Sequence, residues 1–127
     1  MGALNPSPSL PAPPLTPPSG VRVALLLPLS GPAGRLGSAM LNAAQLAVFA
    51  FADDDFELLI HDTQGTPEGA YDAAALAIGD GASLILGPLL ANSVRAVAPA
   101  ARAANVPVIA FSSDRTVSGE GVYTMGF

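Results

Sequence analysis

The sequence predicts an α/β fold with a doubly wound parallel sheet, and three observations support this prediction. From residue 21 onward, short apolar segments suited to buried strands alternate with longer helical segments. The links between these segments are short and contain the glycines, prolines and small polar residues that favour turns. Half of the 127 residues are hydrophobic, which is enough for the core of one folded domain.

Strands and helices alternate regularly along the chain. In order, we expect Val21–Leu27 (strand), Leu36–Phe51 (helix), Phe56–His61 (strand), Pro67–Asp80 (helix), Ser83–Leu86 (strand), Asn92–Ala104 (helix) and Val108–Phe111 (strand), with Val122–Met125 as a candidate fifth strand. The first strand is a continuous apolar run, the pattern of a strand buried on both faces of a parallel sheet. Helices on both faces of such a sheet give a Rossmann-like architecture.

Local signals set the helix boundaries. The first helix carries one apolar face, made of Leu36, Met40, Ala43, Ala44, Ala47 and Phe51. The second helix has Thr66 as its N-cap, Pro67 in the first helical position and Gly81 as its stop signal. The third helix contains Pro99, which we expect to kink it.

The twenty N-terminal residues differ in composition from the rest of the chain. They include seven prolines among Ser, Ala, Leu and Thr. Such a segment forms neither a helix nor a sheet ladder, so we expect residues 1–20 to be a disordered tether. The tether serves either as a passive linker or as a proline-rich ligand for a partner. The folded domain then spans residues 21–127.

Composition narrows the function. The net charge is −5 and the five basic residues, all arginines, form no cluster, which argues against a nucleic-acid partner. There is no cysteine, so disulfides, thiolate metal sites and a cysteine nucleophile are excluded. No apolar run has the roughly 18–20 residues that a transmembrane segment needs, and no secretory signal is visible.

The expected binding site lies at the carboxyl ends of the strands, where ligands bind in open α/β sheets. Four loops are expected there: Ser30–Gly34, Asp62–Gly65, Gly87–Ser93 and Ser112–Arg115. The candidate ligand-binding residues of this rim are Ser30, Gly31, Asp62, Leu89, Leu90, Ala91, Ser112, Ser113 and Asp114. For Asp62, Ser112 and Ser113, the alternative is a structural role in which they satisfy amides of their own loops.

The loop after the first strand resembles a phosphate-binding turn only superficially. Gly31, Gly34 and Gly37 have the spacing G-x-x-G-x-x-G, whereas the dinucleotide fingerprint needs G-x-G-x-x-G. Pro32 removes a backbone donor, and a P-loop would need a lysine that this chain lacks. We therefore expect no nucleotide or other cofactor.

Two clusters of titratable residues could indicate a catalytic or a metal site. His61 and Asp62 are neighbours, but successive side chains of a strand point to opposite faces, so they diverge. The acidic run Asp53–Asp55 has no calcium-loop spacing and fits a solvated turn. No nucleophile–base pair, metal cluster or G-x-S-x-G motif is present, so the sequence predicts a protein that is not an enzyme.

Four segments occur together in order: "VALLLPLSGPAGRLGSAMLNAAQLA", "HDTQGTPEGA", "DGASLILGPLLANSV" and "ANVPVIAFSSD". They resemble the first lobe of the type I periplasmic binding proteins, the branched-chain amino-acid receptor superfamily. "LLLPLSG", "LGPLL" and "VPVIAFS" are most similar to the penicillin-binding-protein activator branch, the LpoA/LppC-like lipoproteins. The resemblance covers about Val21–Phe127 and implies two similar lobes that close on a ligand, of which this chain supplies one.

At two positions that the resemblance identifies, this sequence differs from the amino-acid receptors. In those receptors, the loops after the third and fourth strands offer hydroxyls to the ligand, and the matching positions here are Ala91 and Asp114. Both changes weaken binding of an α-amino acid and favour the activator branch. The leading hypothesis is thus a periplasmic, non-enzymatic domain that activates a penicillin-binding protein and is lipid-anchored to the outer membrane through the tether.

The alternative hypothesis is a solute-binding protein of an ABC transporter for amino acids or another small polar ligand. From the resemblance we expect residues 21–127 to form the first lobe alone, with the surface that would face the second lobe open. We therefore also expect self-association of the isolated lobe.

Overall fold

The structure is a computed structural model, which describes residues 21–52, 55–112, 118–119 and 121–125. Its centre is a five-stranded sheet with the order β2-β1-β3-β4-β5. The strands are β1 (Val21–Leu27), β2 (Phe56–Asp62), β3 (Leu84–Leu86), β4 (Val108–Ala110) and β5 (Val122–Thr124). All four strand pairings are parallel, so the predicted parallel sheet is confirmed and the candidate fifth strand is part of it.

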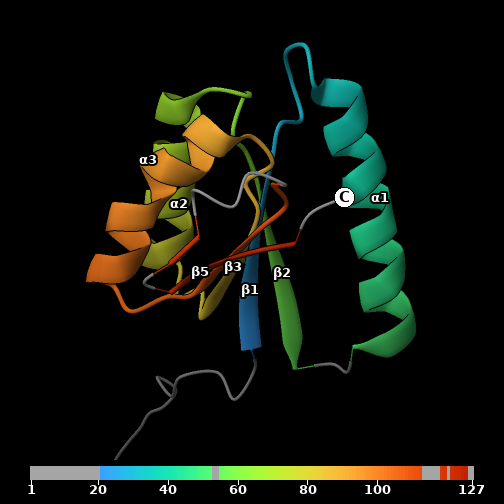
Figure 1. Ribbon diagram of the computed structural model, residues 1–127. Helices are drawn as coiled ribbons and strands as arrows, with labels where there is room; N and C mark the ends of the chain where they lie inside the picture. Colours follow the sequence, from blue (N-terminus) through green and yellow to red (C-terminus); the bar gives the residue numbers. More distant parts are fainter. Residues whose placement is uncertain (1–20, 53–54, 113–117, 120, 126–127) are drawn as a thin grey trace, which may run out of the picture.

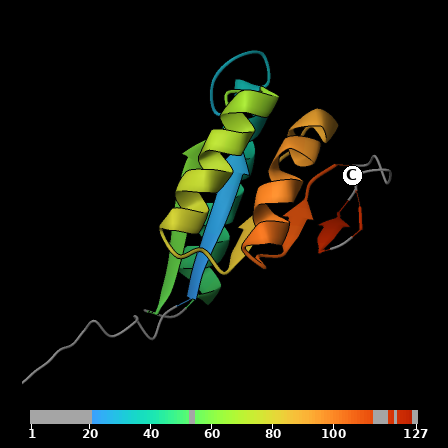
Figure 2. The same cartoon turned by 90° about the vertical axis from the view of Figure 1, so that its left-hand side faces the viewer.

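Helices cover both faces of this sheet. They are α1 (Gly34–Phe51), α2 (Pro67–Gly79) and α3 (Ala91–Ala103). Helices α2 and α3 lie side by side on one face, and α1 lies on the other (Figure 1 and Figure 2). Because β2 and β3 flank β1 on opposite sides, the strand order reverses at β1. The switch point, where open α/β sheets bind ligands, is therefore at the carboxyl ends of β1 and β3.

The main core lies between the sheet and the α2–α3 layer. From the sheet it takes alternate residues of the central strands, such as Ala24, Leu26, Ile85 and Val108, all fully buried. The helices contribute small or β-branched side chains on one face: Ala70, Ala73, Ala74 and Ala77 from α2, and Val94, Val97, Ala98 and Ala101 from α3. Alanines let both helices approach the sheet closely, which fixes the position of the loops at its carboxyl edge.

Helix α1 begins two residues earlier than the sequence predicts, and it packs through a different face. Leu36, Ala43 and Ala47 of the predicted apolar face are exposed, whereas Gly37 is buried. The cause is a close contact: a Cβ added at Gly37 would overlap the carbonyl group of Pro28. The contact with the residue that follows β1 is thus set by a glycine, and apolar side chains of α1 are left at the surface.

Two further features of the helices bear on the sequence predictions. Helix α3 continues through Pro99 to Ala103. Within the part of the chain that the structure describes, no helix is both long and apolar enough to cross a bilayer.

The predicted tether, residues 1–20, lies outside the described residues.

Candidate functional site

Asp62 joins the loops that follow β1 and β2. It is the last residue of β2 and pairs in register with Leu27, the last residue of β1. Its Oδ1 accepts hydrogen bonds from the backbone N–H of Leu29 at 2.8 Å and of Gln64 at 2.7 Å, and its Oδ2 accepts one from the Ser30 hydroxyl at 2.7 Å. One carboxylate therefore holds both loops together at the rim of the sheet.

The ionisation of Asp62 follows from these contacts. Partial burial alone would raise the pKa of Asp62, but hydrogen bonds from the Ser30 hydroxyl and from the Gln64 and Leu29 amides outweigh it. The net result is a pKa below the ordinary value, so the carboxylate is ionised at neutral pH. A charged acceptor makes stronger hydrogen bonds than a neutral one, which suits a structural brace.

The loops that follow β3 and β4 form a second unit of the rim. The backbone N–H of Gly87 donates to the Ile109 carbonyl at 2.8 Å, and that of Phe111 donates to the Pro88 carbonyl at 3.0 Å. Gly87 has a φ of +100°, and a Cβ there would overlap the carbonyl of Leu26 in the neighbouring strand. Only glycine fits, and this tight crossing aims the following residues at the start of α3.

The starts of the three helices at this rim differ in how their backbone donors are satisfied. At α2, the Thr66 side chain accepts from the Gly69 N–H at 3.0 Å, and Glu68 lies in the first turn. At α1 and α3, the N-cap residues are Ala33 and Leu90, neither provides a side-chain cap, and neither first turn holds an acidic residue. Uncapped amides and the helix dipole favour a carboxylate or another anionic group by about 0.3–1 kcal/mol at each terminus.

The predicted rim residues are distributed as follows. Ser30 and Asp62 are bonded to each other, and Gly31 lies against the backbone of Gln64. Leu89, Leu90 and Ala91 lead into α3, with Leu89 and Ala91 half-buried and Leu90 38 % exposed. Ser112 follows β4 and is buried. Ser113 and Asp114 lie outside the described residues, so their roles stay predictions.

Two polar groups near this rim were not predicted as site residues. The Leu29 amide is bonded to Asp62, a backbone contact that only the spatial pairing of the two strands reveals. Ser93, in the first turn of α3, is fully buried, and its hydroxyl has no hydrogen-bond partner among the described residues. The sequence signal for Ser93 is a lone polar residue on an otherwise apolar helix face, at the end of the predicted loop Gly87–Ser93.

His61 is not among the groups that hydrogen-bond the Asp62 carboxylate, which are Ser30 and the Leu29 and Gln64 amides. Its side chain is half-buried, and within the described part of the chain its Nε2 has no hydrogen-bond partner. Nor do the described residues contain any group of three or more His, Cys, Asp or Glu placed to hold a metal ion.

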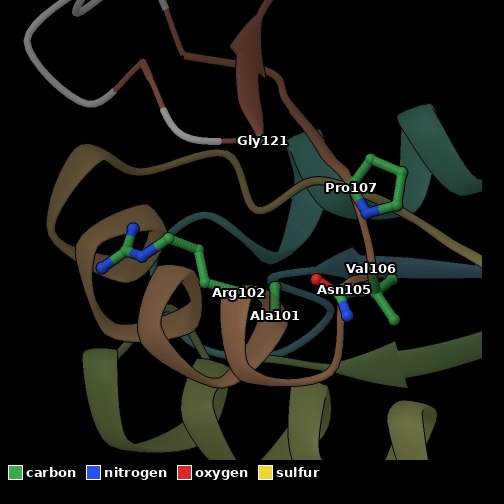
Figure 3. Close-up of a pocket in the computed structure, with 6 residues that line it drawn as sticks. All are labelled: Ala101, Arg102, Asn105, Val106, Pro107 and Gly121. Atoms are coloured by element: carbon green, nitrogen blue, oxygen red, sulfur yellow. The ribbon is translucent and has the colours of Figure 1, made fainter.

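A pocket of about 470 Å³ lies at the other edge of the sheet, where α3 ends and β4 begins. Its lining includes Arg102, Asn105, Pro107 and Gly121. Figure 3 shows that the Arg102 side chain extends away from Asn105, so the two polar groups do not converge on one point. This pocket offers no concerted polar contact and lies apart from the switch point.

Known proteins share this architecture. The family model described as periplasmic binding protein matches residues 20–127. Leucine-binding protein LivK from Thermotoga maritima aligns with a TM-score of 0.76 and 26% identity, over 82% of this chain and 32% of its own. An ABC transporter substrate-binding protein from Sphaerobacter thermophilus aligns with a TM-score of 0.73 and 29% identity, over 84% of this chain and 32% of its own.

A third similar structure is not named as a transporter protein. Full-length LpoA from Haemophilus influenzae aligns with a TM-score of 0.69 and 22% identity, over 86% of this chain and 20% of its own. At this identity the likeness shows a shared fold alone. No curated protein matches the chain significantly. The chain spans about a third of the length of the LivK and Sphaerobacter proteins. With a family match over residues 20–127 and the fold of a type I binding-protein lobe, this chain belongs to the periplasmic binding protein family.

Proposed function

We propose that this lobe is a non-enzymatic interaction domain that activates a penicillin-binding protein in peptidoglycan synthesis. One observation carries the proposal: Ser30 and Asp62, the polar side chains that the loops after β1 and β2 place at the rim, are bonded to each other. Asp62 is engaged by Ser30 and by two backbone amides. The start of α3 presents Leu90 and Ala91 instead of hydroxyls. Such a rim offers apolar surface to a protein more readily than side-chain hydrogen bonds to a small polar ligand.

The experiment uses the full-length protein and a bifunctional peptidoglycan synthase from the same cells. We expect the synthase to be retained in a pull-down and its glycan polymerisation rate to rise when the protein is added. Leu90→Asp places a charge in the rim and is expected to lower the stimulation by about tenfold, the effect of losing a central apolar contact. Leu76→Asp, on the outer surface of α2 and 62% exposed, is the matched control. Absence of binding and stimulation by the unaltered protein would contradict the proposal.

A solute-binding protein of an ABC transporter is the second candidate function. Its support is the pair of uncapped helix starts at α1 and α3, which suit a ligand carboxylate. The similar structures also include LivK and the Sphaerobacter substrate-binding protein, whose names describe small-ligand binding. A thermal-shift screen of the full-length protein with leucine, isoleucine and benzoate tests it. A ligand raises the melting temperature progressively with its concentration. An unchanged melting temperature with all three compounds counts against this function.

The proposal also includes where the protein lies in the cell. We infer a periplasmic protein, attached to the outer membrane by a lipid that precedes the proline-rich segment. In an extended polyproline conformation, twenty residues reach roughly 60 Å, which would let the domain stand away from the membrane surface. Cell fractionation, combined with mass spectrometry of the mature N-terminus, tests this. Recovery in the soluble periplasmic fraction without a lipid would contradict the anchoring.

A further inference from the structure

A shallow groove on the outer surface of the helix layer lies between α2 and α3. Its volume is about 360 Å³, and its lining includes Pro67, Glu68, Tyr71 and Asp72 from α2 and Ala96 from α3. Pro67 is the first residue of α2, so the groove opens near the carboxyl edge of the sheet. Ala96 is small, which leaves room beside the tyrosine ring, and Tyr71 is 51% exposed.

The charges at this groove are unbalanced. Glu68 and Asp72 are one helical turn apart on α2, so their carboxylates share one face beside Tyr71. Both side chains are exposed, and neither forms an ion pair or hydrogen bond with its side chain in the described structure. Glu68 is within the first turn, where the helix dipole offsets part of its charge, but Asp72 lies beyond that turn. The groove therefore combines an exposed aromatic face with net negative charge.

We propose that this groove is a docking site for an arginine-bearing segment of a partner protein. A guanidinium group is planar, so it can stack on the ring of Tyr71 while its N–H groups reach the carboxylates beside that ring. Carboxylate–guanidinium hydrogen bonds are charge-assisted and directional, which lysine matches less well. The apolar lining from Pro67 and Ala96 accommodates the methylene stem of the same side chain.

This inference does not depend on either candidate function. The groove is built from the outer sides of α2 and α3, whereas the rim is built from the loops after β1, β2, β3 and β4. A partner held in the groove would approach the helix layer and leave the rim accessible. Failure of docking here would consequently say nothing against the functions proposed for the rim.

The probe is a blocked pentapeptide, acetyl-Leu-Arg-Ala-Leu-Arg-amide, titrated into ¹⁵N-labelled protein and followed by two-dimensional NMR. We expect saturable amide shifts that cluster at Glu68–Asp72 and around Ala96. The same peptide with citrulline in place of arginine keeps the shape but removes the charge. It should produce no saturable shifts if the guanidinium is what the groove recognises.

Two doubly substituted variants separate the groove from general electrostatics. Glu68→Gln with Asp72→Asn should weaken binding at least about fivefold, whereas Asp55→Asn with Asp80→Asn should weaken it less than about twofold. Both pairs change the net charge equally, but Asp55 and Asp80 lie at the opposite edge of the sheet. Tyr71→Leu should weaken binding about threefold. Equal losses in the two charge variants, or shifts that map to the rim or to the exposed face of α1, would overturn the proposal.

Discussion

The Ser30 hydroxyl donates a 2.7 Å hydrogen bond to Asp62 Oδ2 and thereby joins two loops that are 32 residues apart in sequence. The register of β1 and β2, which pairs Leu27 with Asp62, brings the two residues to the same edge of the sheet. Oδ1 of the same carboxylate holds the Leu29 amide. This half of the rim is thus assembled within the lobe, before any ligand or partner binds.

Removing the Asp62 carboxylate should destabilise the fold. Asp62→Ala leaves the Leu29 and Gln64 amides and the Ser30 hydroxyl without their acceptor, and we expect a loss of about 1–3 kcal/mol in the free energy of unfolding. Asp62→Asn keeps one oxygen for the two amides and should lose less. Urea denaturation followed by circular dichroism measures both. A loss below about 0.5 kcal/mol for the alanine variant would show that water replaces the carboxylate.

The contribution of Asp62 to stability should depend on pH in one direction. Its pKa in the folded protein lies below the ordinary value of 3.8, so the unfolded chain binds the proton more readily. The stabilisation is therefore fully present above that ordinary value and is lost as the pH falls through the folded-state pKa. The difference in unfolding free energy between the unaltered protein and Asp62→Asn should shrink below pH 3.8. Urea titrations at several acidic pH values check this, and a constant difference would contradict it.

A pair of glycine substitutions tests the close approach of α1 to Pro28, the residue that follows β1. Gly37→Ala adds a Cβ that would overlap the Pro28 carbonyl, so α1 must move, and we expect at least about 1–3 kcal/mol of destabilisation. Gly79→Ala is the matched control, because a Cβ there meets nothing within 4 Å. The alanine at 79 should be neutral or stabilise α2 by up to about 1 kcal/mol through its helix propensity. Thermal unfolding of both variants decides, and similar melting temperatures would contradict the predicted contact.

The order of strands and helices was predictable because its signals are local. Apolar runs of strand length, the Thr66–Pro67 helix start and the proline- and glycine-containing links each act within a few residues. The packing face of α1 was not predictable in the same way. It depends on the contact between Gly37 and the Pro28 carbonyl, and a count of apolar side chains around the helix favours a different face.

The site was predictable only in part, for a related reason. Parallel strands place their following loops at one edge, so Ser30 and Asp62 could be assigned to a common rim from the sequence. Their mutual hydrogen bond and the use of the Leu29 amide depend on backbone geometry that no residue pattern encodes. The acidic groove between α2 and α3 could not be predicted from the sequence, because its walls come from separate helices.

Exposed apolar side chains on α1 lead to a prediction about association. Phe49 is 91% exposed and Leu46 is 70% exposed, an unusual pair for the surface of a monomer. We expect the 127-residue chain to self-associate as its concentration rises, and Leu46→Glu with Phe49→Glu to keep it monomeric through like-charge repulsion. Ala75→Glu with Leu76→Glu adds the same charge on α2 and should leave association unchanged. Sedimentation velocity at several concentrations measures this, and equal behaviour of the two variants would show that net charge, not the α1 surface, controls association.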